Sequence, residues 1–269
     1  MNESEPVSSR GDPPVPATWI DDDRMKNTVE DSASHSNPGP GLRLSALRYS
    51  REHDHVLGNK YERNRIFVDL ASQGKRILEL GCADGFISRH LTERGCQVTG
   101  VEIDSEAAER ARKWCKQVVN YDLNDPGWLP QVDGNFDTIL CGDVLEHLIE
   151  PEVVLRNVHR LLAPGGRVII CLPNIAHIRI RLMLLSGRFQ YESAGIMDVT
   201  HLRFYTYKSA RELIERTGYN IISYYPLVGG GAASRWFRAP LHKLFARSMM
   251  FVAKPAEELT SVSLPSHKD

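Results

Sequence analysis

The sequence predicts an α/β domain in which helices cover both faces of a mostly parallel sheet that ends in an antiparallel hairpin at one edge. Short apolar runs alternate with helical patterns along the middle of the chain, which is typical of parallel sheets built from crossover units. Glycine-containing turns follow several of these runs, as strand-to-helix connections require. With 269 residues, of which 42% are hydrophobic and 25% charged, the chain is long enough for one large core.

The predicted elements follow one another in the order of such a fold. A helix that ends near residue 70 comes first. The predicted strands are 76–80, 97–103, 118–121, 136–141 and 166–172. The predicted helices are 85–94, 106–115, 151–162 and 207–217. The stretches 219–227 and 248–253 are expected to form the edge hairpin, with an excursion between them that contains Gly229–Gly231 and a helix within 236–245.

The two ends of the chain differ in composition from its middle. Residues 1–43 are rich in Pro, Ser and Asp, and acids outnumber bases by eight to three within residues 1–40. Such a stretch buries too little apolar surface to offset its ordering entropy, so we expect a disordered acidic arm. Residues 255–269 are expected to form a flexible tail. The folded domain is therefore expected over residues 44–254.

Charge and cysteine content exclude several classes of function. The 33 basic and 34 acidic residues give a net charge of −1, so no global basic surface for nucleic acid is expected. The five cysteines include no C-x-x-C pair, which argues against a disulfide framework or a zinc site and favours the reducing cytoplasm. The longest apolar runs, such as Val168–Leu172, are too short to span a bilayer.

Glycines and carboxylates stand at the ends of successive predicted strands. Gly81 and Gly85 follow the first strand and let the backbone turn sharply and approach a ligand. Glu102 ends the second strand, where an acid can accept both hydroxyl hydrogens of a ribose. Asp122 and Asp143 follow the third and fourth strands. Taken singly, the glycines indicate a tight turn and the acids indicate helix caps, but their repeated placement favours a ligand site at the carboxyl ends of the strands.

Five motifs carry a family resemblance when they are taken in order. They read ELGCADG at 79–85, GVEID at 100–104, YDL at 121–123, FDTILCGDVLEHL at 136–148 and LLAPGG at 161–166. Together they resemble the class I S-adenosylmethionine-dependent methyltransferases, in the small-molecule and glycan-associated branch with type 11 and type 23 domains, over roughly residues 60–254. The resemblance implies a Rossmann-like fold and S-adenosylmethionine as cofactor. A nicotinamide-dinucleotide site would have a glycine where Ala83 stands.

The resemblance also implies roles for individual residues in the cofactor site. Carboxylates suit this cofactor because its sulfonium and ammonium groups are both cationic. Asp104 is expected instead to cap the following helix. The implied roles are Gly81 and Gly85 along the methionine portion, Glu79 at the amino group, Glu102 at the ribose, Asp122 at the adenine and Asp143 beside the sulfonium.

A hydroxyl acceptor needs a base or a metal ion to take its proton. Asp143, Glu146 and His147 stand at positions i, i+3 and i+4, which share a face of a helix. This pattern resembles the divalent-metal motif of ubiquinone-biosynthesis O-methyltransferases and of small-RNA 2′-O-methyltransferases, which would make Mg²⁺ a second cofactor. The alternative, which we favour, is that the motif binds no metal and that His147 has a structural or substrate-facing role beside Asp143.

Residues 173–205 form the expected acceptor-side insert between the fifth strand and the next helix. The stretch resembles bacterial methyltransferases of glycan and secondary-metabolite pathways, and it contains His177 and His201 as candidate general bases. We favour His201 because it lies close to Asp198 in a polar-aromatic run. The region has four basic residues: Arg179, Arg181, Arg188 and Arg203. They favour an anionic acceptor. Alternatively, Arg179 and Arg181 merely solvate a helix whose apolar residues pack down as a lid, or that helix faces lipid.

The sequence therefore predicts a cytoplasmic S-adenosylmethionine-dependent O-methyltransferase that acts on a small-molecule or glycan-type hydroxyl acceptor. Alternatives are transfer to carbon or nitrogen, a metal-assisted catechol or quinol O-methyltransferase, and a non-catalytic protein that binds the cofactor and regulates a partner enzyme. We expect no nucleic-acid partner and no membrane span, and the sequence gives no prediction of oligomeric state.

Overall fold

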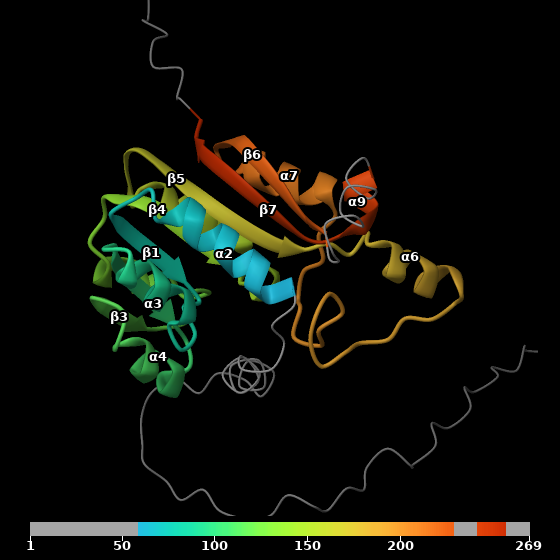
Figure 1. Ribbon diagram of the computed structural model, residues 1–269, viewed down its shortest axis with the longest axis horizontal. Coiled ribbons are helices and arrows are strands. Elements are labelled where there is room, and N and C mark those ends of the chain that lie inside the picture. The colour runs from blue at the N-terminus through green and yellow to red at the C-terminus, as the bar shows by residue number, and fades with distance from the viewer. Residues whose placement is uncertain (1–58, 229–240, 257–269) are drawn as a thin grey trace, which may run out of the picture. The chain divides into compact units, whose positions relative to one another are not determined.

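The computed structural model describes residues 59–228 and 241–256 (Figure 1). All the described elements belong to one unit of the chain, within residues 38–269. The strands are β1 (Arg76–Leu80), β2 (Gln97–Glu102), β3 (Gln117–Asn120), β4 (Phe136–Gly142), β5 (Leu162–Pro173), β6 (Tyr219–Val228) and β7 (Ala246–Pro255). The α-helices are α2 (Asn59–Ala71), α3 (Phe86–Glu93), α4 (Ser105–Ala111), α5 (Pro151–His159), α6 (Ile178–Leu185), α7 (Tyr207–Arg216) and α9 (His242–Phe245), and the 3₁₀ helices are η1 (Pro126–Gln131) and η2 (Leu145–His147).

The described strands form one sheet in the order β3-β2-β1-β4-β5-β7-β6. Strands β1 to β5 run parallel, β7 pairs antiparallel with β5, and β6 pairs antiparallel with β7. The predicted fold class is therefore confirmed, including the edge hairpin, in which β7 lies inside the sheet and β6 forms its edge. Because β1 to β5 are parallel, their carboxyl ends meet at one edge of the sheet, where ligands bind in folds of this kind.

Apolar side chains of one strand supply both faces of the sheet, as a strand covered on both sides requires. On β5, Val168, Ile170 and Leu172 pack into the cluster that contains α5 and α7. The residues between them, Ile169 and Cys171, pack into the cluster that contains α2 and α3. In Figure 1, α2 crosses one face of the sheet and α7 lies behind β6 and β7.

The predicted Pro-Gly-Gly turn lies within β5 rather than before it. Phe136 pairs with Leu162 and Thr138 pairs with Arg167, so β5 has extra residues at this point and forms a bulge. Gly165 adopts φ +77° there, a conformation that glycine reaches without steric cost. The strand therefore begins at Leu162, four residues before the predicted start.

Three predictions fall wholly or mainly on parts of the chain that the structure does not describe. They are the disordered arm over residues 1–43, the excursion over Gly229–Gly231, and the flexible tail, of which only Pro255 and Ala256 are described. Of the helix expected within 236–245, the structure describes the turn α9. Across residues 59–228 and 241–256, no helix has the length and apolar character needed to cross a bilayer.

The expected insert leaves the sheet at the carboxyl end of β5 and returns at α7. Its two ends meet, because Asn174 pairs with Tyr205. The Asn174 side-chain amide also donates to the carbonyl groups of Lys243 and Ala246, which connects the insert to α9 and β7. The insert has a small apolar cluster of its own, which is built on the buried residues Ile180, Ile196 and Met197.

The alternative in which all the apolar residues of α6 pack down as a lid does not hold. Ile180 is buried, but Leu182, Leu184 and Leu185 are exposed. Residues two apart point to different sides of a helix, so Leu182 cannot share the buried face of Ile180, whereas Leu184 stands four residues after Ile180 and is exposed although it lies on the same face.

Replacement of Gly100 by alanine is expected to destabilise the protein by about 1–3 kcal/mol, the usual cost of overpacking a well-packed site. A Cβ atom at Gly100 on β2 would lie 2.5 Å from the sulfur of Cys82, in the loop after β1. Urea unfolding measures the change. In a Cys82→Ala background, which lacks the sulfur, the added Gly100→Ala change should cost much less unfolding free energy than it costs in the wild type. If the cost is the same in both backgrounds, the close approach of Gly100 to Cys82 is not its cause.

Candidate active site

The loop between β1 and α3 has the backbone of a ligand-binding turn. Gly81, Ala83 and Gly85 adopt φ values of +66°, +47° and +82°. The left-handed region is rare for residues with a side chain, so Ala83 must be kept there by its surroundings. The carboxylate of Glu102 does this: its Oε2 accepts the Ala83 N–H at 2.8 Å, and its Oε1 accepts the Asp104 N–H at 2.9 Å.

A cavity opens beside this loop at the carboxyl end of β1. The loop supplies Gly81 and Asp84, β1 supplies Glu79, and α2 supplies Arg63 and Phe67. The structure thus places Glu79 and Gly81, two of the predicted cofactor residues, in one cavity wall.

Gly85 has a packing role at the start of α3. A Cβ atom there would lie 3.0 Å from the Cα of Ala111 on α4, so the absence of a side chain lets α3 begin against α4. Its role toward the cofactor stays a prediction.

In the cavity wall, the Glu79 side chain and one oxygen of Asp84 are buried, and neither acid forms an ion pair with a described residue. Burial raises the pKa of Glu79 to about 8, although the Ser88 hydroxyl donates to its Oε2 and favours the ionised form. Asp84 Oδ1 is buried and accepts no hydrogen bond from the described residues. Burial also raises the pKa of Glu102. A cationic ligand would offset the cost of desolvating these carboxylates and lower their pKa, because an opposite charge favours the ionised form.

The remaining strand-end acids have local partners. Asp122 Oδ1 accepts hydrogen bonds from the backbone and the side-chain amide of Asn124. Asp104 caps α4, because its Oδ1 accepts the Ala107 N–H at 2.7 Å, as predicted. The ribose role of Glu102 and the adenine role of Asp122 stay predictions.

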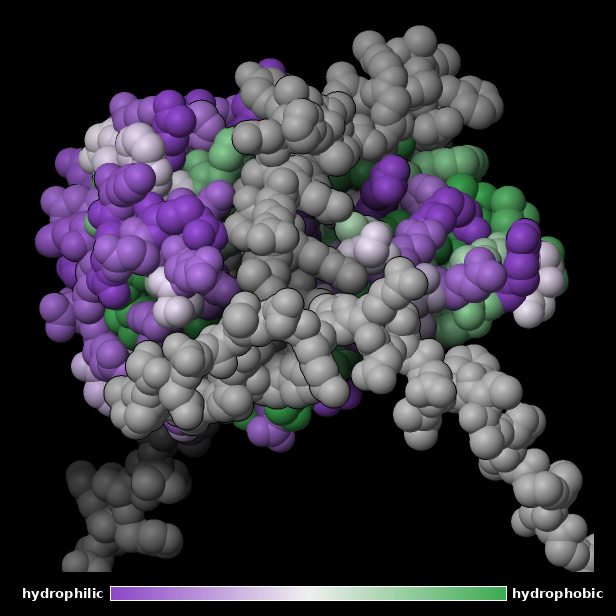
Figure 2. All heavy atoms as spheres, turned by 90° about the horizontal axis from the view of Figure 1, so that it is seen from below, coloured by the Kyte–Doolittle hydropathy of each residue, from purple (hydrophilic) through white to green (hydrophobic). Residues whose placement is uncertain are grey.

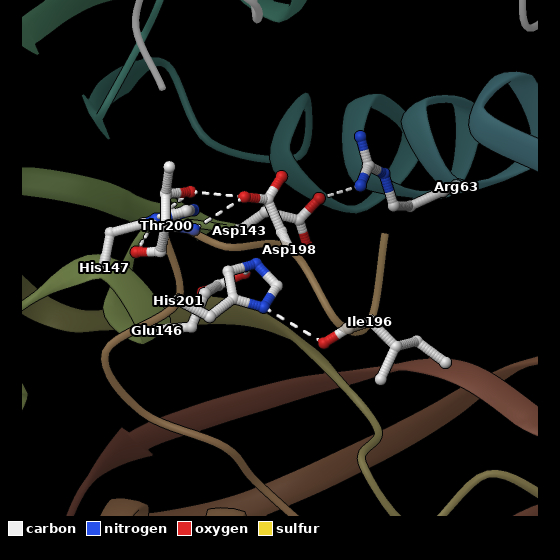
Figure 3. A network of polar contacts seen from close by, with 8 residues as sticks. All are labelled: Arg63, Asp143, Glu146, His147, Ile196, Asp198, Thr200 and His201. Carbon is white, nitrogen blue, oxygen red and sulfur yellow. Dashed lines mark hydrogen bonds and ion pairs between the residues drawn. The ribbon is translucent and has the colours of Figure 1, made fainter. Parts of the chain in front are cut away.

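The prediction that Asp143, Glu146 and His147 share one helical face is wrong. Asp143 ends β4 with φ +52°, so it stands outside the helix, and η2 begins only at Leu145. The Asp143 carboxylate forms an ion pair with Arg63 of α2. Figure 3 shows Asp143 turned toward Arg63, while Glu146 lies beside His201.

The structure instead brings Glu146 and His147 together with His201 from the insert. One ligand-type atom from each of the three side chains lies within 4.8 Å of the other two. Glu146 Oε1 is 4.0 Å from His201 Nε2, and the two imidazole rings stand edge to face with centroids 4.9 Å apart. The Glu146 carbonyl accepts the N–H groups of Leu202 and Arg203, which fixes the insert against η2. We call these three residues the Glu–His–His cluster.

Backbone carbonyls select the tautomer of both histidines (Figure 3). His147 Nδ1 lies 3.1 Å from the carbonyl oxygen of Thr200, and His201 Nδ1 lies 3.2 Å from that of Ile196. A carbonyl oxygen only accepts, so Nδ1 carries the proton in each ring. In the neutral form, Nε2 is therefore the basic nitrogen of each histidine.

Burial sets the charges of this cluster. It lowers the pKa of His147, and burial together with the neighbouring His147 lowers the pKa of His201 to about 4. It raises the pKa of Glu146 to about 8, and neither oxygen of Glu146 accepts a hydrogen bond from the described residues. At neutral pH both imidazoles are neutral, and Glu146 is largely protonated.

The predicted basic residues of the insert have structural partners. Arg179 forms a two-bond pair with Glu192 at 2.6 and 2.9 Å. Arg203 donates to the Ile149 carbonyl. His177 caps α6, since its Nδ1 accepts the Arg179 N–H at 3.1 Å. These contacts favour the structural interpretation of Arg179, Arg203 and His177.

Comparison with known proteins places the chain in a family. A family model described as a methyltransferase domain matches residues 49–224, which is more than half of the chain. This chain belongs to that methyltransferase family. Ubiquinone biosynthesis O-methyltransferases of Pseudomonas aeruginosa and Coxiella burnetii are 33% and 32% identical over 101 and 99 residues, or 36% of this chain. The matches cover 44% and 42% of those relatives, so this chain spans less than half of their length.

Solved structures share the fold of this methyltransferase at low sequence identity. An N-methyltransferase from Bradyrhizobium japonicum in complex with S-adenosylhomocysteine has a TM-score of 0.54 and 18% identity, over 79% of this chain and 97% of the other. A TehB-like methyltransferase from Corynebacterium glutamicum has a TM-score of 0.51 and 20% identity, over 81% and 100%. The chain thus belongs to the methyltransferase family and has the fold of these S-adenosylmethionine-dependent methyltransferases, as its motifs predicted.

The cavity fits the charge of this cofactor. S-Adenosylmethionine carries an ammonium and a sulfonium group. The cavity wall contains the buried carboxyl group of Glu79 and the buried Oδ1 of Asp84, and neither acid forms an ion pair with a described residue. Sequence reasoning missed Arg63, Phe67 and Asp84 as cavity residues. Asp84 stands inside the predicted motif, but Arg63 and Phe67 precede it on α2, where no motif marks them.

The Glu146→Gln variant of this methyltransferase is expected to lose less stability than the wild type as the pH rises. The pKa of Glu146 is about 8 in the folded state and near 4.5 when unfolded, so the folded protein binds more protons in this range. Stability is therefore lost as the pH rises through this range. Between about pH 6 and about pH 9, the Tm of Glu146→Gln should fall at least about 3 °C less than that of the wild type.

Scanning calorimetry at both pH values makes this measurement. The matched control is Glu106→Gln on α4, whose side chain is 81% exposed. The control should follow the wild type at both values. If Glu146→Gln also follows the wild type, Glu146 does not titrate abnormally.

Proposed function

We propose that this methyltransferase transfers a methyl group to the hydroxyl oxygen of a small molecule. The observation that carries the proposal is the Glu–His–His cluster, which presents two neutral imidazoles at the carboxyl edge of the sheet, against the insert. An oxygen acceptor must lose a proton, which a neutral imidazole can take. The partial likeness to ubiquinone biosynthesis O-methyltransferases supports an oxygen acceptor.

The cofactor site of the proposal is the cavity at the end of β1. Glu79 and Asp84 would bind the ammonium group, Gly81 lets the backbone approach the ligand, and Glu102 retains lone pairs for the ribose after accepting two backbone donors. Asp143 lies farther along the same edge, where Arg63 orients its carboxylate. When bound, the cofactor supplies an electrophilic methyl group.

His201 is the proposed general base. Its Nδ1 proton is committed to the Ile196 carbonyl, so Nε2 is free to accept the acceptor's proton. As that proton leaves, the acceptor oxygen would bond the methyl carbon while the bond between that carbon and the sulfonium sulfur breaks; the electron pair stays on the sulfur, and S-adenosylhomocysteine is the leaving group. Glu146 lies 4.0 Å from Nε2. Its ionised form, which is the minor one at neutral pH, would stabilise the imidazolium that results, so transfer should rise as the pH approaches the Glu146 pKa of about 8. His147, whose ring contacts that of His201, is a second candidate for the same proton.

A metal-assisted reaction is the second candidate, and the same cluster favours it. Two imidazoles and one carboxylate, with both Glu146 oxygens free of hydrogen bonds from the described residues, form a donor set that suits Zn²⁺, Mn²⁺ or Fe²⁺. Mg²⁺ prefers oxygen ligands and near-octahedral geometry. A metal site here would therefore favour a transition metal over the Mg²⁺ that the motif suggested, and a catechol or quinol would be the fitting acceptor.

The acceptor class is part of the proposal. A phenol, catechol or sugar hydroxyl each presents the proton that the cluster would take. The two-bond pair of Arg179 with Glu192 neutralises that arginine, so an anionic acceptor would depend on Arg181, Arg188 or Arg203.

Replacement of His201 by alanine is expected to lower kcat by a factor of about 10²–10⁴, the usual contribution of a general base. Transfer of radiolabelled methyl groups from S-adenosylmethionine to a panel of phenols, catechols and hexosides measures kcat. Calorimetric titration should show unchanged affinity for S-adenosylhomocysteine. His90→Ala, at an exposed position on α3, is the control and should keep full activity. Unchanged turnover of His201→Ala on the best acceptor would exclude His201 as the base.

A chelator separates the two candidates. Protein treated with EDTA should keep full transfer activity if His201 acts as a base alone. Loss of activity that Zn²⁺ or Mn²⁺ restores, with metal binding abolished in Glu146→Gln, would establish the metal-assisted reaction instead.

A further inference from the structure

Exposed apolar side chains gather on α6 and the loop that follows it. The exposed fractions are 57% for Leu182, 48% for Leu184, 84% for Leu185, 55% for Phe189 and 53% for Tyr191. We call these five residues the insert tip. Figure 1 shows α6 away from the sheet, and Figure 2 shows hydrophobic residues interspersed with strongly hydrophilic ones on the corresponding side.

The insert tip stands on a packed base. Ile180, Ile196 and Met197 form the apolar cluster beneath it, and the pair of Arg179 with Glu192 connects α6 to the returning loop. The rings of Phe189 and Tyr191 contact each other edge to face at 5.4 Å. The five exposed residues therefore project from a packed scaffold, and a contiguous exposed apolar patch of this kind is typical of an interaction site.

Positive charge surrounds the insert tip. Residues 174–191 contain three arginines and no acid. Arg179 pairs with Glu192, but Arg181 donates to the Ala176 carbonyl at 2.7 Å and Arg188 donates to the Ser186 hydroxyl at 3.2 Å. Both of these oxygens are uncharged, so the positive charges of Arg181 and Arg188 stay beside the exposed leucines.

We propose that the insert tip docks this enzyme on the surface of an anionic lipid bilayer. Leucine and aromatic side chains bordered by arginines are the composition of segments that lie in the headgroup region, where apolar burial and attraction to anionic lipids act together. Five residues are few for a specific protein interface, which uses roughly 20–30 residues on each side. A helix of eight residues is also too short to cross the bilayer, so it would lie in its surface.

Docking would bring the Glu–His–His cluster near the lipid. Ring contacts lead from Tyr191 to Phe204 at 6.5 Å and from Phe204 to His201 at 6.0 Å. An acceptor with an apolar tail would then reach the cluster from the bilayer. This consequence rests on the proposed function, whereas the docking itself does not, because it is measured without cofactor or acceptor.

Sedimentation with lipid vesicles tests the docking of the full chain. The protein should sediment with vesicles of phosphatidylcholine and phosphatidylglycerol, and much less with phosphatidylcholine alone. The double variant Leu185→Glu/Phe189→Glu should bind the anionic vesicles at least about tenfold more weakly. Arg181→Gln and Arg188→Gln should each weaken this binding about fivefold. Higher salt should weaken it as well.

Ile222→Glu provides the matched control. Ile222 lies on β6 and is 55% exposed, so it tests whether any new surface charge has the same effect. Ile222→Glu should bind vesicles like the wild type, and all variants should keep the wild-type Tm and affinity for S-adenosylhomocysteine. Absence of binding to anionic vesicles would overturn the proposal, as would equal losses in Ile222→Glu and the double variant. A dimer in light scattering that only the tip variants dissociate, without vesicle binding, would assign the tip to self-association instead.

Discussion

The two backbone hydrogen bonds that the Glu102 carboxylate accepts connect the loop after β1 to the end of β2. The bond from the Ala83 N–H keeps Ala83 in a left-handed conformation that a residue with a Cβ atom rarely adopts, and the bond from the Asp104 N–H orients the carboxylate that accepts it. With Ala83 fixed there, Gly81 and Asp84 line the cavity beside Glu79. The cofactor cavity therefore depends on one buried acid whose lone pairs are shared between the loop and, in our proposal, the ribose.

Desolvation of carboxyl groups recurs along the same edge of the sheet. Glu79 lies beside the loop and Glu146 lies beside the insert, and burial raises the pKa of each to about 8. Each would become ionised when a positive charge arrives: the ammonium group of the cofactor at Glu79, and an imidazolium or a metal ion at Glu146. The two sites thus use one physical principle, the desolvation of a carboxyl group, for binding and for chemistry.

Local patterns in the sequence predicted the sheet, the helices and the acids at strand ends, because each of these depends on neighbouring residues. The strand Arg76–Leu80 and the cap at Asp104 are examples. Contacts between residues that lie far apart in the sequence could not be predicted from local patterns. No spacing rule brings Arg63 to Asp143, or His201 to Glu146, and the positive φ of Asp143 broke the helical register that the motif suggested. On α6, apolar spacing failed to show that three leucines face outward.

Proton release on cofactor binding tests the central claim most directly. Near pH 7, Glu79 is mostly protonated in the free enzyme because its pKa is about 8, and pairing with the ammonium group of S-adenosylhomocysteine should ionise it. Calorimetric titration in buffers of different ionisation enthalpy should therefore show release of about one proton per ligand, and Glu79→Gln should abolish most of this release. If the wild type binds S-adenosylhomocysteine without releasing a proton, and Glu79→Gln binds it with the affinity of the wild type, the account is contradicted, since the ammonium group would then bind elsewhere.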